Sequence, residues 1–279
     1  MESGKRAICA GPGNPPVVVD ETANIDKAAR DIVFGASFDN NIICADEKEC
    51  LVVASVADKL IKAMTYNGAY LVTKEQLPAL EKVVFKKTYG PRQEAEIDRS
   101  LIGKNASVIL QKAGIACDDS VRLGIVEVEH DHPLLWTEQM MPVLPVVRGS
   151  TVDQAIDLAV RSEHGFRHTA IIHSNDVRAM TKMGRLLDTT LFIKNGPSTA
   201  GLGLGGEGYI SFSIATPTGG ITCPCSHSSQ RPVLGSTNVA VINALSHVIM
   251  SEGLEAKEFI EERCDKEGFR AWKDFILDP

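Results

Sequence analysis

Short β-branched runs alternate with segments of helical periodicity along most of the chain, and this alternation restricts the fold more than any other feature. Strands are predicted at residues 16–19, 51–53, 123–128, 143–147, 169–173, 191–194 and 209–214. Helices are predicted at residues 24–35, through Leu60 and Met64, and at residues 152–160 and 177–187. Parallel strands need long crossover connections, and these spacings provide them. The sequence therefore predicts an α/β domain with a mostly parallel sheet flanked by helices.

The composition argues against several classes of protein. Of 279 residues, 44% are hydrophobic and 23% are charged, which is sufficient for a sizeable core. The 29 Lys and Arg residues against 36 Asp and Glu residues give a net charge of −7 without a basic cluster, so nucleic acid is not an expected partner. Apolar runs fall short of the ~20 residues of a membrane span. The first residues, 1–6, precede no apolar stretch of the kind found in signal peptides.

Cysteine usage predicts a cytoplasmic chain with free thiols. The seven cysteines are Cys9, Cys44, Cys50, Cys117, Cys223, Cys225 and Cys264. An odd number of scattered cysteines, without an export signal, is typical of a reducing compartment. Cys223 and Cys225 are separated by one residue and stand near His227, but zinc-ligand pairs usually have two to four intervening residues. We therefore expect no metal site.

Domain organisation is indicated by a cluster of Gly, Pro, Ser and Cys residues between Pro217 and Pro232, which is typical of a loop or linker. It predicts an α/β domain at residues 1–222, followed by a linker and a helical tail at residues 223–279. The tail is predicted to contain two helices, at residues 238–249 and 256–263.

Two side chains stand where a scaffold of this class carries reactive groups. Cys44 lies in the connection between a predicted helix and the next strand, and a thiol is a good nucleophile. A cysteine beside two isoleucines is, taken alone, more often a small buried hydrophobe. Glu138 precedes a strand bracketed by prolines, and the ordinary alternative for it is a surface carboxylate.

A glycine-rich segment and two histidines are weaker signals. Residues 201–208 contain a literal G-x-G-x-x-G, but residues 209–214 alternate like a strand where a dinucleotide-binding loop needs a helix. We therefore reject a Rossmann phosphate loop there. His168 and His173 flank a predicted strand, so at most one faces a cleft, and a core or surface histidine is the default for both.

Taken together, several segments resemble, in order and spacing, the catalytic half of the CoA-acylating aldehyde dehydrogenases, above all the acetaldehyde and propionaldehyde dehydrogenases of ethanolamine and propanediol utilisation. The likeness covers roughly the first four-fifths of the chain. The matching segments are residues 11–20, 40–48, 138–145, 167–170, 194–197 and 201–208. The resemblance implies an aldehyde dehydrogenase catalytic domain with a helical C-terminal tail.

The resemblance also implies roles for individual residues. Cys44 falls on the nucleophilic cysteine, and its amide with the side chain of Asn41 would hold the oxyanion. Glu138 falls on the acid that contacts the nicotinamide ribose, and His168 is assigned to cofactor binding. The implied reaction oxidises acetaldehyde or propionaldehyde with NAD and releases the acyl group to coenzyme A. A homo-oligomer in the cytoplasm, or within a bacterial microcompartment, is expected.

By the same resemblance, Cys9 aligns with the glutamate that acts as general base in the hydrolytic members of the superfamily. Hydrolysis of an acyl-cysteine needs a base to activate water, whereas the thiol of CoA, with a reference pKa of ~8.5, supplies its own nucleophile. The substitution therefore favours thiolysis. A hydrolytic aldehyde dehydrogenase remains an alternative, as does a catalytically silent fragment or scaffold that keeps the fold.

Two departures from the family pattern are apparent. The family's nucleotide-binding domain would precede residue 1, so we expect weak or no turnover from this chain alone. From about residue 230 the sequence resembles instead a helical segment of molybdopterin-dependent formate dehydrogenases, without any cofactor ligand that can be transferred.

Overall fold

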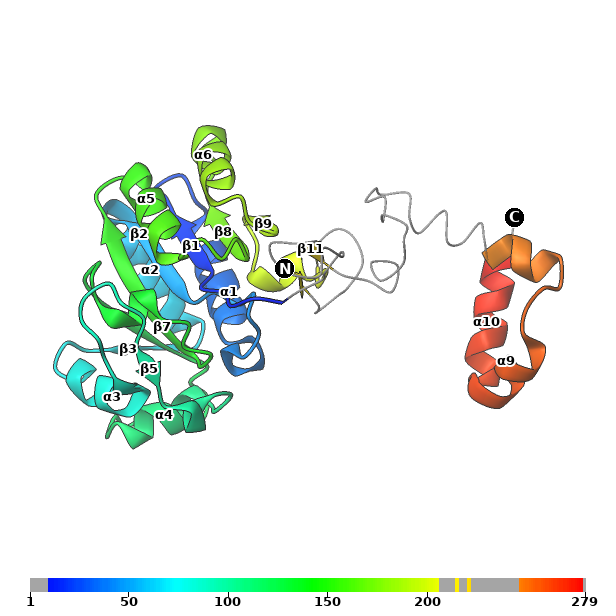
Figure 1. Cartoon of the computed structure of the whole chain (residues 1–279), viewed down its shortest axis with the longest axis horizontal. Helices are drawn as coiled ribbons and strands as arrows, with labels where there is room; N and C mark the ends of the chain where they lie inside the picture. The colour runs from blue at the N-terminus through cyan, green and yellow to red at the C-terminus, as the bar shows by residue number, and fades with distance from the viewer. Residues whose placement is uncertain (1–9, 206–213, 216–219, 222–245, 278–279) are drawn as a thin grey trace, which may run out of the picture. The chain divides into compact units, whose positions relative to one another are not determined.

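A seven-stranded parallel sheet forms the centre of the N-terminal part of the chain (Figure 1). The structure is a computed structural model and describes residues 10–205, 214–215, 220–221 and 246–277. The strand order is β3-β6-β7-β2-β1-β8-β9, and every neighbouring pair is parallel. The strands are β1 Pro16–Val19, β2 Glu49–Val53, β3 Ala69–Val72, β6 Leu123–Glu127, β7 Val143–Gly149, β8 Thr169–His173 and β9 Leu191–Lys194.

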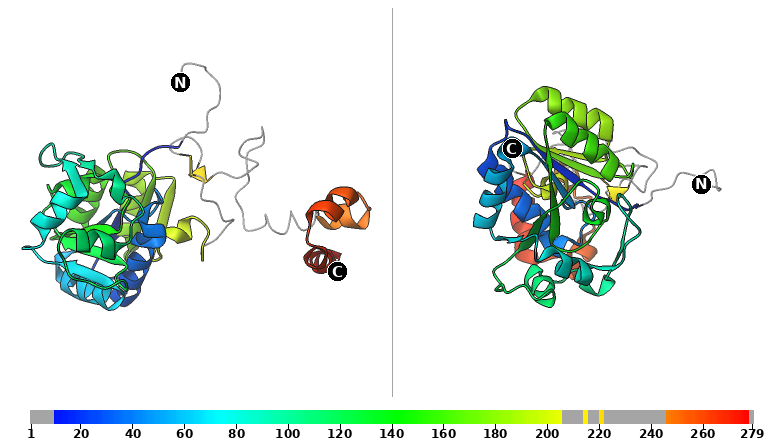
Figure 2. Two further views of the ribbon diagram at one scale, coloured as in Figure 1. Left: turned by 90° about the horizontal axis from the view of Figure 1, so that it is seen from below. Right: turned by 90° about the vertical axis from the view of Figure 1, so that its left-hand side faces the viewer.

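Helices form most of the crossovers between these strands and cover the sheet, as the additional views in Figure 2 show. Three of them begin at a side chain that accepts a backbone N–H of the first turn: Asn24 before α1, Thr151 before α5 and Asp176 before α6. The helices are α1 Ile25–Ala36, α2 Ala54–Tyr66, α3 Leu77–Val84, α4 Ala106–Lys112, α5 Val152–Ser162, α6 Val177–Leu187 and α7 Ser198–Gly201.

Short elements complete this part of the chain. Two small antiparallel pairs lie outside the main sheet. They are β4 Phe85–Lys87 with β5 Glu96–Ile97, and β10 Ile214–Ala215 with β11 Gly220–Ile221. The 3₁₀ helices are η1 Phe38–Asn41, η2 Arg99–Leu101 and η3 Pro133–Trp136. η1 leads directly into the segment that contains Cys44.

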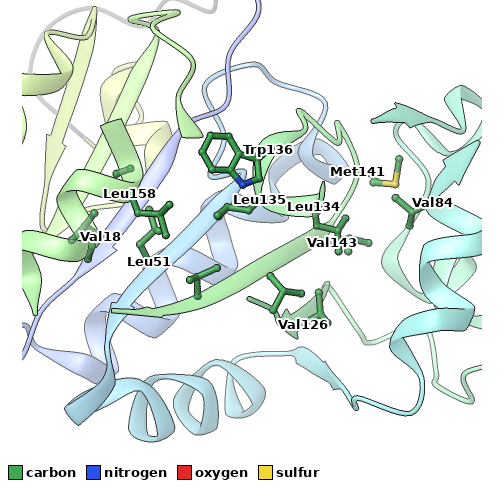
Figure 3. Packing of buried hydrophobic residues seen from close by; sticks show 14 of the residues in the cluster. Val18, Leu51, Val84, Val126, Leu134, Leu135, Trp136, Met141, Val143 and Leu158 are labelled. Atoms are coloured by element: carbon green, nitrogen blue, oxygen red, sulfur yellow. The ribbon is translucent and has the colours of Figure 1, made fainter. Parts of the chain in front are cut away.

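Two hydrophobic clusters lie on opposite faces of the sheet because successive strand residues point in opposite directions. Val17 and Val19 of β1 pack with α1 and α2, whereas Val18 packs with α5 and α6. The cluster that contains Val18 extends to Leu134, Leu135 and Trp136 of η3, beside the start of β7 (Figure 3). Burial on both faces explains why the strands read as continuous apolar runs.

The predicted α/β fold with a parallel sheet is confirmed. The strand predicted at 169–173 and the helix predicted at 177–187 match β8 and α6 residue by residue. β3, with the sequence Ala-Tyr-Leu-Val, was not predicted: it follows α2 closely, and its two middle residues are not buried. The strand predicted at 209–214 lies outside the described residues except for Ile214.

The chain divides into two compact units, residues 1–227 and 228–279. Within the second unit, α9 spans Lys257–Arg263 and α10 spans Lys266–Leu277. The ring Nδ1 of His247 lies 2.8 Å from the carbonyl oxygen of Ile276, and Lys273 pairs with Glu255 at 3.1 Å. α10 was not predicted.

The predicted division at residue 222 and the resemblance of the tail to a formate dehydrogenase segment both stay predictions. Across the described parts of the chain, helices are too short or too polar to cross a membrane.

Candidate active site

The residues singled out in the sequence meet at one edge of the sheet. Cys44 precedes β2, Glu138 precedes β7 and His168 precedes β8, while Gly13 precedes β1. The order β7-β2-β1-β8 makes these four strands consecutive neighbours. Because parallel strands begin at the same edge, the four preceding segments come together at the amino ends of the strands.

Gly13 is the residue around which the others gather. A Cβ atom at this position would lie 2.8 Å from the carbonyl oxygen of Cys44 and 3.0 Å from Cγ of the His168 ring. Its backbone N–H is one of the groups that lower the pKa of the Glu138 carboxyl, against the larger effect of burial. Gly13 therefore contacts Cys44, His168 and Glu138, and the close approach requires a residue without a side chain.

The turn that carries Cys44 is built from left-handed residues. Asp39, Asn40 and Asn41 have φ angles of 44°, 53° and 63°. Asp and Asn tolerate this conformation better than other residues with a side chain, which explains their run at this point of the sequence. The side-chain amide of Asn40 also donates to the carbonyl oxygen of Gly103 at 3.0 Å and so fixes the outer side of the turn.

Lys48 holds the inner side of the turn. Its side chain is fully buried. The ammonium nitrogen donates to the carbonyl oxygen of Asn41 at 2.7 Å, to Oδ1 of Asn41 at 2.6 Å and to the carbonyl oxygen of Ile43 at 3.0 Å. Three acceptors match the three donors of an ammonium group. The bonds tie the backbone on both sides of the turn immediately before Cys44.

Asn41 is engaged at every polar atom of its amide. Oδ1 accepts from Lys48, and Nδ2 donates to the carbonyl oxygens of Ala36 at 2.8 Å and Glu47 at 3.0 Å. In this arrangement both amide hydrogens stay inside the turn. These contacts indicate that Asn41 shapes the Cys44 segment. Its predicted role in stabilising an oxyanion stays a prediction.

The Cys44 thiol is half-buried and lies among charges of both signs. Burial raises the pKa of the thiol, and the Glu138 carboxylate raises this pKa further, whereas the Lys48 ammonium lowers it. Glu138 is itself half-buried, and desolvation raises the pKa of its carboxyl. The resting site therefore favours the thiol, and removal of its proton depends on the groups that surround it.

His168 is neutral at pH 7. Burial lowers the pKa of its imidazole to about 4, and the Lys48 charge acts in the same direction. Its Nδ1 lies 2.8 Å from Oγ1 of Thr169, and its backbone N–H donates to Oε1 of Glu163 at 3.0 Å. A neutral imidazole beside Gly13 can accept or donate a proton, according to its tautomer.

Glu163 organises the loop that leads to His168. Backbone N–H groups of Gly165, Phe166, Arg167 and His168 are directed at its carboxylate, and they oppose the effect of burial, which raises its pKa. Positive φ angles at His164, Gly165 and Arg167 turn the chain around this carboxylate. The loop is thus fixed by a side chain at the end of α5.

Sequence reasoning did not assign a role to Lys48, Gly13 or Glu163. The sequence did carry a signal for Lys48. It lies in a charged run that leads directly into a strand, and all four residues of the run are buried: Asp46, Glu47, Lys48 and Glu49. Charged residues are rarely buried without a partner or a function. The close approach of Gly13 depends on strand order and had no local signal, whereas the loop around Glu163 is formed by the residues that directly follow it.

Several other predictions meet the limits of the described residues. Cys9, Cys223, Cys225 and His227 lie outside them. Cys44, Cys50, Cys117 and Cys264 are free thiols. Among the residues that the structure describes, no group of three or more His, Cys, Asp or Glu side chains is arranged to hold a metal ion.

Comparison with known proteins adds an independent line of support. The family described as "Aldehyde dehydrogenase family" matches residues 1–208. The acetaldehyde dehydrogenase (acetylating) EutE of Salmonella typhimurium is 50% identical over 221 residues, which are 79% of this chain and 47% of that protein. The chain thus spans about half the length of the curated relatives it matches.

Solved structures agree. A Rhodopseudomonas palustris propionaldehyde dehydrogenase with bound CoA and an acylated cysteine has a TM-score of 0.74 and 52% identity, and the match covers 79% of this chain and 49% of that one. A propionaldehyde dehydrogenase from the Clostridium phytofermentans fucose utilisation bacterial microcompartment has a TM-score of 0.76 and 42% identity, covering 84% and 53% of the two chains.

Proposed function

This chain belongs to the aldehyde dehydrogenase family, and from that membership we propose that it is the nucleophile-bearing part of a CoA-acylating aldehyde dehydrogenase for acetaldehyde or propionaldehyde. The observation that carries the proposal is the meeting of Cys44, Glu138 and His168 around Gly13. A thiol, a carboxylate and a neutral imidazole from separate loops then share one edge of the sheet.

Cys44 is proposed to carry the acyl group. Its sulfur bonds to the carbonyl carbon of the substrate, and its backbone N–H is available to stabilise the oxygen that becomes negative. In the transfer step, the thiolate of CoA attacks acyl-Cys44, the bond from carbon to Sγ breaks, and the product is acyl-CoA with a free Cys44 thiolate. The same exchange run backwards loads Cys44 from acyl-CoA without any change of oxidation state.

The residues present fit the nicotinamide end of NAD. The Glu138 carboxylate is half-buried, lies close enough to Cys44 to raise its pKa, and is an acceptor suited to ribose hydroxyl groups. Glu138 would hold the ribose, and His168 lies beside Gly13. Bound NAD would supply the hydride acceptor for the oxidation.

A second candidate, the catalytically silent fragment, is favoured by one observation. Burial and Glu138 raise the pKa of Cys44, and a thiol of raised pKa reacts slowly. The hydrolytic alternative is disfavoured by Cys9 at the position of the general base. We further propose self-association of the chain and residence in the cytoplasm or a bacterial microcompartment, in keeping with its likeness to proteins of such systems.

Transfer of an acyl group from acyl-CoA to Cys44 distinguishes the enzymatic function from the silent fragment. The chain is incubated with propionyl-CoA at pH 8, and each cysteine is assayed for a propionyl group by peptide mass spectrometry, with released CoA measured in parallel. We expect propionyl on Cys44 and none on Cys117, which is half-buried like Cys44 but lies far along the chain in another loop. Cys44→Ser should abolish CoA release.

The opposite result has a defined meaning. If Cys44 remains unmodified while the chain is folded, the silent-fragment reading replaces the enzymatic one. Formation of NADH from acetaldehyde with and without CoA then tests the hydrolytic alternative, because acid production that is independent of CoA would contradict the thiolysis argument.

A further inference from the structure

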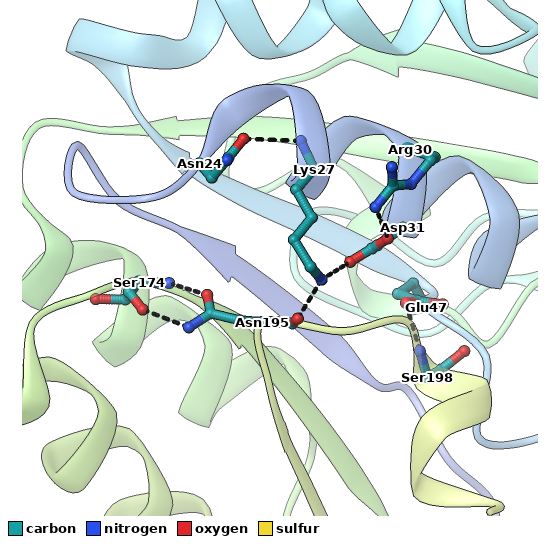
Figure 4. Close-up of polar contacts among 8 residues, drawn as sticks. All are labelled: Asn24, Lys27, Arg30, Asp31, Glu47, Ser174, Asn195 and Ser198. Atoms are coloured by element: carbon teal, nitrogen blue, oxygen red, sulfur yellow. Dashed lines mark hydrogen bonds and ion pairs between the residues drawn. The ribbon is translucent and has the colours of Figure 1, made fainter. Parts of the chain in front are cut away.

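A buried carboxylate connects the Cys44 turn to the segment that leads into the glycine-rich run. Glu47 lies three residues after Cys44 and is fully buried. Its Oε1 accepts a hydrogen bond of 2.9 Å from the backbone N–H of Ser198, the first residue of α7 (Figure 4). α7 ends at Gly201, where the glycine-rich run begins.

The fold makes room for this carboxylate. Gly35 of α1 faces it, and a Cβ atom on Gly35 would come closer to both carboxylate oxygens of Glu47 than real atoms approach one another. At the other end of the residue, the carbonyl oxygen of Glu47 accepts from the Asn41 amide at 3.0 Å. Glu47 is thus joined to the Cys44 turn by its backbone and to α7 by its side chain.

The segment before α7 is fixed by additional contacts that do not involve the Cys44 turn. Lys27 of α1 donates to the carbonyl oxygen of Asn195 (Figure 4). The Asn195 side chain exchanges two hydrogen bonds with the backbone of Ser174, at 3.0 and 2.8 Å. These contacts hold the start of the segment, whereas the bond from Ser198 to Glu47 couples its continuation to the residues around Cys44.

The buried charge of Glu47 indicates a role other than stabilisation of the fold. Oε2 of Glu47 has no hydrogen-bond partner among the described residues, so the charge is buried with incomplete compensation. Apolar residues of similar volume usually serve a core at least as well as a buried charge. A carboxylate that costs stability and lies beside a nucleophile is a candidate for a functional role.

We propose that Glu47 is a positioning residue that fixes the Cys44 turn against α7 through the N–H of Ser198, and so sets the placement of the Cys44 thiol. The proposal rests on the proposed function of Cys44 as nucleophile, and it adds a residue that does not itself touch the substrate.

Deletion of one N–H tests the proposal. Ser198→Pro removes the donor at the first position of a helix, where proline is tolerated, and Pro197 has φ −71° and ψ 158°, which suit a following proline. Ser198→Ala keeps the donor and removes only the hydroxyl. The rate of Cys44 propionylation by propionyl-CoA, the rate of alkylation by iodoacetamide at pH 8 and the thermal midpoint are measured for both variants.

We expect Ser198→Pro to slow propionylation of Cys44 by about tenfold or more, since misplacement of a reacting group by about 1 Å can cost that much. Ser198→Ala should change the rate by less than about fivefold, because it keeps the backbone donor and the Ser198 hydroxyl has no hydrogen-bond partner among the described residues. Alkylation of Cys117 should be the same in all variants.

Glu47→Ala provides a second route to the same contact. Combined with Ser198→Pro, it should cause no loss of rate beyond that of either single change, because both delete one interaction. Additive losses, or a wild-type rate in a folded Ser198→Pro chain, would overturn the proposal. If the unmodified chain takes no propionyl group, the proposed function fails, and the ratio of Cys44 to Cys117 alkylation still reports whether Glu47 positions the thiol.

Discussion

The ammonium nitrogen of Lys48 lies 2.6 Å from Oδ1 of Asn41 and 2.7 Å from the carbonyl oxygen of the same residue. One buried cation thus occupies both acceptors of a residue whose backbone is left-handed. This contact orients the side-chain amide of Asn41. Its Oδ1 faces Lys48, and its Nδ2 donates to the carbonyl oxygens of Ala36 and Glu47. Together with its bond to the carbonyl oxygen of Ile43, Lys48 holds the backbone immediately before Cys44.

Replacement of Lys48 should therefore destabilise the domain. Lys48→Met keeps the apolar stem but leaves three acceptors, two of them in buried contacts, without a donor. We therefore expect the free energy of unfolding to fall by about 3–5 kcal/mol. Urea denaturation measures the change. Lys182→Met is the control, because Lys182 is partly exposed and pairs with the exposed Asp153, and it should cost less than about 1 kcal/mol. Equal losses in the two variants would contradict the role of Lys48.

Gly13 should not tolerate a methyl group. In Gly13→Ala the new Cβ would lie 2.8 Å from the Cys44 carbonyl oxygen, so either Cys44 or His168 must move. We expect a loss of about 1–3 kcal/mol in stability and a reduction of Cys44 propionylation by about tenfold. Gly124→Ala, whose Cβ meets its nearest neighbour at 3.5 Å, should leave propionylation unchanged. Comparable rates in both variants would argue against a shared site around Gly13.

Removal of the Glu138 charge should make Cys44 more reactive toward a simple alkylating reagent. Glu138 raises the pKa of the thiol, so Glu138→Gln should lower that pKa and increase the thiolate fraction at pH 8. The rate of iodoacetamide labelling should rise by about twofold or more, because the thiolate is the reactive species. Glu129→Gln, at an exposed position, is the control. A slower rate would show that Glu138 does not act on Cys44 by its charge.

Glu47 should make stability depend on pH. Burial raises the pKa of Glu47 to about 7, above its value in the unfolded chain, so the stabilisation it contributes is present below about pH 4.5 and is lost as pH rises through about 7. Glu47→Gln does not titrate. The stability of the original chain relative to this variant should fall by up to about 1.4 kcal/mol per pH unit in that window. Urea denaturation at pH 5 and pH 8 measures it, and a constant difference would refute it.

Local pattern was sufficient for most of the secondary structure. Fully buried parallel strands such as β8 are recognisable because both faces need apolar side chains, and α1 and α6 are marked by capping residues. β3 escaped prediction because two of its four residues are not buried, so it lacks the continuous apolar run of the central strands. α10 also escaped prediction, although its apolar residues recur at helical spacing. The resemblance of the tail to a formate dehydrogenase segment assigned no role to any residue. The contacts of α9 and α10 therefore cannot test it.

The location of the site could not be predicted in the same way. Open parallel sheets usually bind ligands at the carboxyl ends of their strands, yet Cys44, Glu138 and His168 all lie before a strand. The sequence showed each of them beside a strand but not which strands are neighbours. Their meeting depends on the order β7-β2-β1-β8, which no local run of residues encodes.

The amino-acid sequence by itself determined an α/β domain, the family to which it belongs and the cysteine at the centre of the proposed chemistry. The tertiary structure decided which groups surround that cysteine. Lys48 acts on backbone atoms of the turn that precedes it in the chain. Glu47 and Gly13 act through contacts with segments distant in the chain, and such contacts exist only after the strands have paired. A reactive group can be recognised by its chemistry, whereas the residues that hold it are defined by distances that only the folded chain creates.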